Sequence, residues 1–195
     1  MPDKLRIMAK DTYAGFDELA KHEKVDTDYQ IAISDVGSAV TIVAPHGGKI
    51  EPSTSEIARR IASDTYNCYC FSGIKKSNNS RLHITSHNFD EPTALKLIST
   101  SDIVIAIHAC TGTAGLVYLG GLDTPLKQSI AAELQARGIG VSMKDSRFKG
   151  ANPDNICNRG RTGKGVQLEI TRDLRDDPAQ KEIIAEAVRA TLTGY

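Results

Sequence analysis

Four polar side chains next to apolar segments could together perform hydrolytic chemistry. His46 and Glu51 follow an apolar segment, His108 directly follows the apolar run 103–107, and Glu169 lies inside another apolar segment. Two imidazoles and one carboxylate are a common ligand set for catalytic zinc, which keeps a further position for water. A second carboxylate that does not bind the metal can then act as a general base. These residue types therefore point to a metal-assisted hydrolase, with Glu169 as the base.

The spacing of these residues also leaves a structural interpretation open. The chain has no His-Glu-x-x-His helix and no Cys-x-x-Cys pair that would identify a metal site by spacing alone. A histidine at the end of a strand can be a hydrogen-bonded structural group, and Glu51 could favour the dipole of the helix expected after it. Glu169 is harder to explain in this way, because an unpartnered carboxylate is costly to bury. The two glycines after His46 allow a sharp turn that could bring Glu51 to the same ion.

The elements that must position these residues alternate between strands and helices. Apolar patterning predicts strands at 29–34, 39–44, 66–71, 103–107, 116–119, 139–143 and 166–170. Start and stop signals predict helices at 14–22, 53–61, 90–99, 124–138 and 177–192. Ser53, three residues before Glu56, predicts a capping box. The segment 35–38 predicts a hairpin turn that joins the first two strands.

This alternation predicts an α/β fold with a mixed, mostly parallel sheet and helices on both faces. Sites in such sheets gather beyond the carboxyl ends of the strands. The expected positions of His46, His108 and Glu169 agree with this rule.

Composition fits a single domain spanning residues 1–195, with 40% hydrophobic and 25% charged residues. Lys+Arg and Asp+Glu both number 24, so the chain lacks the basic excess of a non-specific nucleic-acid binder.

No secretory signal or apolar stretch of about 18 to 20 residues is visible, so we expect a cytoplasmic monomer that does not enter a membrane. If phage-encoded, it would be released by lysis. Without a secretory signal, we expect Cys68, Cys70, Cys110 and Cys157 to be reduced.

Several segments resemble known zinc hydrolases. The strands that end at His108 and contain Glu169 are similar to those carrying the last zinc histidine and the catalytic glutamate of metallocarboxypeptidases. The chain resembles the phage-type poly-γ-glutamate hydrolase family more closely, over roughly residue 29 to the C-terminus. The segments that carry this resemblance are 44–52, 82–86, 89–92, 120–123, 155–159 and 165–170.

The resemblance implies a zinc carboxypeptidase-like fold and cleavage of γ-glutamyl amide bonds in poly-γ-glutamate. One Zn²⁺ per chain would be bound by His46, Glu51 and His108, with Glu169 accepting the water proton. We expect Arg159 or Arg161 to stabilise the oxyanion, and leave open which one. One departure is that four residues separate His46 from Glu51, whereas two separate the corresponding pair in carboxypeptidases.

A poly-γ-glutamate substrate carries one carboxylate per residue, so a local cluster of basic side chains should bind it. The candidates in loops near the expected site are Lys49, Lys75, Lys76, Arg81, Arg159, Arg161 and Lys164. His83 could contact the substrate, assist the oxyanion or replace one of the metal ligands. A solvated surface explains each lysine equally well.

Three other functions remain open at the level of sequence. A thiol amidase could use Cys157 or Cys110 with His108 as base. A zinc amidase or peptidase could act on another substrate, and a phage-derived protein could have a non-enzymatic role in replication. The sequence also leaves open endo or exo cleavage and preference for D- or L-glutamate.

Overall fold

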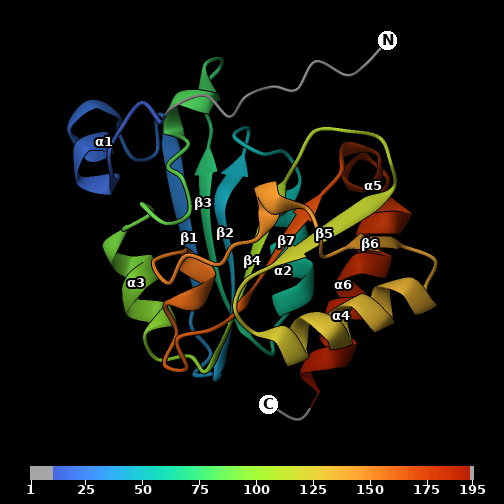
Figure 1. Ribbon diagram of the computed structural model, residues 1–195. Helices are drawn as coiled ribbons and strands as arrows, with labels where there is room; N and C mark the ends of the chain where they lie inside the picture. Colours follow the sequence, from blue (N-terminus) through green and yellow to red (C-terminus); the bar gives the residue numbers. More distant parts are fainter. Residues whose placement is uncertain (1–10, 194–195) are drawn as a thin grey trace.

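A computed structural model describes residues 11–193, which form one seven-stranded sheet with helices on both faces (Figure 1). The strand order is β1-β3-β2-β4-β7-β5-β6. The strands are β1 (Tyr29–Ser34), β2 (Val40–Gly48), β3 (Asn67–Gly73), β4 (Ile103–Ala109), β5 (Leu116–Gly120), β6 (Gly140–Ser142) and β7 (Val166–Ile170).

Parallel pairing predominates, as the sequence predicts. Strands β3, β2, β4 and β7 run parallel to one another, and β5 and β6 form a further parallel pair. The two antiparallel pairings are β1 with β3 and β5 with β7. The predicted hairpin between β1 and β2 is therefore wrong, because β3 lies between them. The carbonyl of Ser38 instead accepts from the Asn67 side chain, whose oxygen accepts from the amides of Val36 and Ser38.

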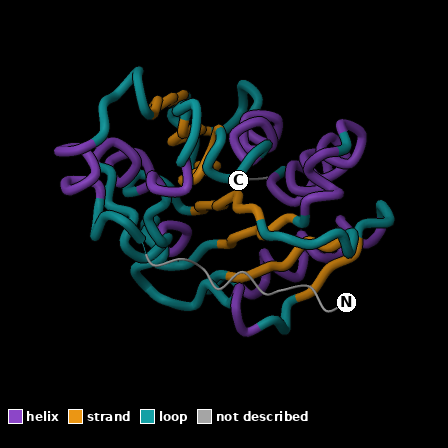
Figure 2. The backbone as a smooth tube through the Cα atoms, turned by 90° about the horizontal axis from the view of Figure 1, so that it is seen from above, coloured by secondary structure: helices purple, strands orange, loops and turns teal. Residues whose placement is uncertain are grey.

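Six α-helices and three 3₁₀ helices connect and cover the strands in the described part of the chain. The α-helices are α1 (Phe16–His22), α2 (Thr54–Ala62), α3 (Pro92–Ile98), α4 (Thr124–Ala136), α5 (Arg172–Asp176) and α6 (Pro178–Leu192). The 3₁₀ helices are η1 (Asn79–Leu82), η2 (Ser146–Phe148) and η3 (Ile156–Asn158). Viewed from above, helices lie on both sides of the twisted sheet (Figure 2).

Alternate residues of the central strands fill two separate cores, as expected for a sheet covered on both faces. Ile105 and Ile107 of β4 pack with α2, α4 and α6. Val104 and Ala106 of the same strand pack on the opposite face with α1, α3 and η3. Cys68 and Cys70 belong to the first core and are free thiols. Because β4 is fully covered, its position in the sheet is fixed, and so is the side chain that it carries at its carboxyl end.

Carboxylate caps start three of the α-helices. Glu91, Asp123 and Asp177 each accept hydrogen bonds from amides in the first turn of α3, α4 and α6. The predicted capping box at Ser53 is wrong. Ser53 has a left-handed backbone with a φ of 74° and makes no side-chain cap, whereas the Thr54 hydroxyl donates to the Glu51 carbonyl at 2.8 Å.

Within residues 11–193, no helix is long and apolar enough to cross a membrane. The carboxyl ends of β2, β3, β4 and β7 meet at one edge of the sheet, where β2 and β4 carry His46 and His108.

Candidate metal centre and active site

A tight turn after β2 returns Glu51 to His46. The Glu51 amide donates to the His46 carbonyl at 2.8 Å, and Gly48 has a φ of +63°. Neither glycine of this turn tolerates a side chain: a Cβ at Gly47 would lie 1.8 Å from the Ser55 hydroxyl, and one at Gly48 would lie 2.4 Å from the Gly73 carbonyl oxygen. The predicted role of the two glycines is confirmed, because they permit the turn that brings Glu51 back to His46 at the end of β2.

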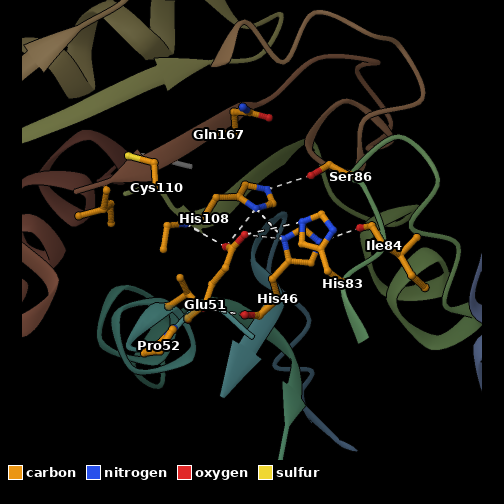
Figure 3. Close-up of polar contacts among 12 residues, drawn as sticks. His46, Glu51, Pro52, His83, Ile84, Ser86, His108, Cys110 and Gln167 are labelled. Atoms are coloured by element: carbon orange, nitrogen blue, oxygen red, sulfur yellow. Dashed lines mark hydrogen bonds and ion pairs between the residues drawn. The ribbon is translucent and has the colours of Figure 1, made fainter. Parts of the chain in front are cut away.

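His46, Glu51 and His108 converge with one potential ligand atom each, all within 4.8 Å of one another. The two Nδ1 atoms are 3.1 Å apart, and His46 Nδ1 is 3.2 Å from Glu51 Oε1. His108 Nδ1 is 3.6 Å from Glu51 Oε2. Figure 3 shows the Glu51 carboxylate facing both imidazoles. The sequence predicted these three residues as ligands, and the structure brings them together.

The outer atoms of both imidazoles have partners that fix their orientation. His46 Nε2 lies 2.7 Å from the Ile84 carbonyl oxygen, and His108 Nε2 lies 3.2 Å from the Ser86 hydroxyl (Figure 3). With Nε2–H donated outward, each Nδ1 presents a lone pair to the centre. Metal-binding histidines in proteins are usually held in this way.

These donors fit a zinc ion. Two lone pairs facing each other beside a carboxylate repel, and a cation between them removes the repulsion. Nitrogen ligands about 2.0–2.1 Å from a tetrahedral zinc lie about 3.3 Å apart, close to the 3.1 Å between the imidazoles. Burial would raise the pKa of Glu51, but His46 and His108 outweigh burial and hold it below its ordinary value.

Glu169 lies beside this cluster on the neighbouring strand. It pairs in register with His108 across β4 and β7, so both side chains project from the same face of the sheet. No hydrogen bond or ion pair engages its carboxylate among residues 11–193. Burial, followed by the negative charge of Glu51, raises the pKa of Glu169 well above its ordinary value. A carboxylate with a raised pKa is a stronger base than an ordinary one, and without a fixed partner it is free to take a proton.

His83 covers the cluster from the loop after η1. Its ring stacks on His46 with 4.0 Å between ring centroids, and Nε2 is 3.9 Å from Glu51 Oε1. Its Nδ1 is 3.0 Å from the Asp11 carboxylate, whose second oxygen accepts from the Thr85 amide at 2.7 Å. Electrostatic interaction with the adjacent His46, followed by burial, lowers the pKa of His83 to about 4. Asp11 was missed by the sequence analysis because nothing in its local sequence signals a contact 72 residues away.

The predicted arginines do not contact the cluster in the described part of the chain. Arg161 pairs with Asp102, and its amide donates to the Ser101 carbonyl; both partners precede β4. His108 lies six residues further along the strand, which corresponds to about 20 Å. The oxyanion role predicted for Arg161 is therefore wrong. The Arg159 guanidinium donates to the Phe89 carbonyl at 2.8 Å.

The predicted substrate-binding cations lie at the carboxyl edge of β3. Lys75 pairs with Glu23 and Asp28, and the exposed Arg81 donates to the Tyr13 hydroxyl. Lys76 is exposed. Acidic and phenolic groups therefore engage part of the expected basic cluster.

The geometry argues against a thiol nucleophile. Cys110 and Cys157 are buried, and burial raises the pKa of each to about 12. Both nitrogens of His108 face other groups, namely His46 and Glu51 on one side and Ser86 on the other. A thiol that is protonated at neutral pH and has no base beside it is a poor nucleophile.

A buried arginine, Arg175 of α5, was also missed by the sequence analysis. It donates to three main-chain carbonyls in the segments that carry the site. Four of the five residues of its helix, Arg172–Asp176, are charged, and nothing in this local sequence indicates that one of the arginines is buried.

The chain matches the family model described as poly-gamma-glutamate hydrolase over residues 13–188. It is 41% identical to the SPbeta prophage-derived protein YoqZ of Bacillus subtilis (strain 168) over 171 residues. That alignment covers 87% of this chain and 62% of YoqZ. It is also 40% identical to YmaC of the same strain, covering 85% of this chain and 71% of YmaC. The chain thus spans under two thirds of YoqZ.

Two solved structures share the fold closely. A bacteriophage poly-gamma-glutamate hydrolase superposes with a TM-score of 0.89 at 33% identity, covering 95% of this chain and 98% of that one. The zinc-free apo form of YndL superposes with a TM-score of 0.88 at 32% identity and the same coverage.

Proposed function

Because this chain belongs to the poly-γ-glutamate hydrolase family, we propose that it is a zinc-dependent hydrolase that cleaves γ-glutamyl amide bonds in poly-γ-glutamate. The observation that carries the zinc assignment is the convergence of His46, Glu51 and His108 with Glu169 beside them. The close fold match to a bacteriophage poly-gamma-glutamate hydrolase supports the substrate assignment. Residues 1–195 would act as a single catalytic domain.

The metal would be held by His46 Nδ1, His108 Nδ1 and the Glu51 carboxylate, one ion per chain. When bound, Zn²⁺ makes a water more acidic and polarises the amide carbonyl. Ile84 and Ser86 keep the two imidazoles in the tautomer that leaves Nδ1 free, and the Ala109 amide, 2.9 Å from Glu51 Oε2, orients the carboxylate.

Glu169 would accept the proton of the attacking water and then deliver it to the leaving amine. Its register with His108 supports this role, since both side chains project from the same face of the sheet, and burial raises its pKa, which makes the carboxylate a stronger base.

His83 would contact the substrate amide. A neutral His83 that donates Nδ1–H to Asp11 presents Nε2 as a hydrogen-bond acceptor. That atom faces Glu51, so it suits an N–H group of a substrate lying over the cluster. Lys75, Lys76 and Arg81 lie at the same edge of the sheet and would attract the polyanion. We propose Arg159 as the residue that would stabilise the oxyanion.

The proposal is tested by incubating the purified protein with poly-γ-glutamate, with and without a metal chelator, and following chain length by size-exclusion chromatography. Poly-α-glutamate serves as the control, since it carries the same charge with α-peptide bonds. We expect shortening of the γ-polymer alone, loss of activity with chelator and recovery with added zinc. Shortening that persists after complete removal of metal would refute the zinc mechanism, and equal cleavage of both polymers would refute the substrate assignment.

A further inference from the structure

Arg175 is a buried cation whose hydrogen-bond partners are all main-chain carbonyls. The residue is only 6% exposed, and no carboxylate lies within salt-bridge distance of it among the described residues. Nε donates to the Ile170 carbonyl at 2.9 Å, Nη1 to the Pro52 carbonyl at 2.6 Å, and Nη2 to the Cys110 carbonyl at 3.2 Å. A buried arginine with this arrangement needs a structural or functional explanation.

The three carbonyls belong to the three segments that carry the site. Pro52 directly follows Glu51, Cys110 comes two residues after His108, and Ile170 directly follows Glu169. These segments are a loop after β2, the end of β4 and the end of β7, and they are far apart in sequence.

Further hydrogen bonds close the network around the guanidinium. The Cys110 amide donates to the same Ile170 carbonyl at 3.1 Å. The Ala109 amide donates to Glu51 Oε2 at 2.9 Å. A shift of any one segment would therefore move the side chains on the other two.

We propose that Arg175 is a positioning residue that holds the segments bearing Glu51, His108 and Glu169 in the relative placement required for metal binding and proton transfer. The inference rests on the proposed function, because it assigns a role toward that metal and that base. Arg175 itself does not touch substrate or metal.

Arginine suits this role better than lysine. A planar guanidinium presents donors in a fixed fork, so one group can reach three carbonyls that lie in different directions. Lysine keeps the charge but lacks the fork. Burial lowers the pKa of Arg175, and the nearby Glu51 carboxylate opposes that change, which fits a cation placed beside the site.

The test compares Arg175→Met and Arg175→Lys with wild type and with Arg189→Met. Arg189 is a matched control, because this half-buried arginine of α6 donates to a single carbonyl, that of Ile61 at 2.9 Å, away from the cluster. The measurements are the zinc dissociation constant, by competition with a chromophoric chelator, and kcat and KM on poly-γ-glutamate.

We expect Arg175→Met to weaken zinc binding or lower kcat by about 10–100-fold, with KM changed much less. Arg175→Lys should show a smaller loss in the same quantities, and Arg189→Met should match wild type in both. If Arg175 only supported folding, its variants would lower stability, as the Arg189 variant could, but they would not show this split between kcat and KM.

The proposal is overturned if folded Arg175→Met keeps zinc affinity and kcat within about twofold of wild type. If Arg175→Met does not fold, Arg175→Lys decides the question by the same criterion, and failure of both variants to fold would make Arg175 a folding residue instead. A wild-type protein that binds no zinc or leaves poly-γ-glutamate intact would instead refute the proposed function, a result that is visible before any variant is made.

Discussion

Replacing Glu169 with Gln separates the proposed proton acceptor from the proposed metal ligands. The amide has nearly the same shape as the carboxylate but cannot accept a proton from water. Glu169 lies next to His108 in register, yet it is not a member of the three-residue ligand cluster. The variant should therefore keep its zinc and lose its activity.

The expected loss in kcat is about 10²–10⁴-fold, the usual contribution of a positioned general acid–base group. This corresponds to about 3 to 5 kcal/mol of transition-state stabilisation. Glu169→Asp keeps the charge but withdraws it by one methylene, so it should fall between wild type and Gln, because about 1 Å of misplacement can cost 10²-fold.

The assay measures initial rates of chain shortening, together with zinc content by elemental analysis. Glu133→Gln is the matched control, since Glu133 is a half-buried glutamate of α4 that pairs with Arg137 outside the ligand cluster. If Glu169→Gln loses its zinc, Glu169 is a ligand and the assignment of the base is wrong. If it keeps its zinc and retains more than about a tenth of wild-type kcat, another group takes the proton.

Three further predictions use other parts of the structure. His108→Ala should lose stoichiometric zinc and activity while keeping its fold, and a zinc content equal to wild type would exclude His108 as a ligand. Treatment of the folded protein with iodoacetamide should leave activity intact, because burial raises the pKa of Cys110 and Cys157 to about 12; inactivation would revive the thiol mechanism. Burial would raise the pKa of Glu23, but hydrogen bonds from Lys75 and Tyr13 outweigh burial and lower it. The ion pair between Glu23 and Lys75 therefore stabilises the fold at neutral pH. Its contribution disappears as the pH falls through the lowered pKa of Glu23. Glu23→Gln should reduce the free energy of unfolding by about 1.5–3 kcal/mol at pH 7 and by much less at acidic pH in urea titrations. An equal difference at both pH values would contradict the ion-pair explanation.

Local sequence was sufficient for most of the elements and for the three candidate ligands. The apolar, β-branched run before His108 suits a strand buried on both faces, and the end of such a strand is expected where parallel strands meet. The two glycines after His46 permit the turn that returns Glu51 to it. Each of these inferences depends on residues within a few positions of one another, so the sequence alone carries them.

Pairing between distant segments was decided only in the tertiary structure. The first two strands looked like a hairpin, yet β3 lies between them, because short-range turn signals cannot reveal which strand supplies the neighbouring hydrogen bonds. Arg161 precedes the Glu169 strand in sequence, but its loop lies at the amino edge of β4, so Arg161 pairs with Asp102. Asp11 and Arg175 reach the site across 72 and 123 residues respectively. The sequence by itself determines the type of each side chain and the hydrophobic periodicity of each helix and strand. Which side chains are buried, and which residues they contact, depends on how distant segments pack on the sheet.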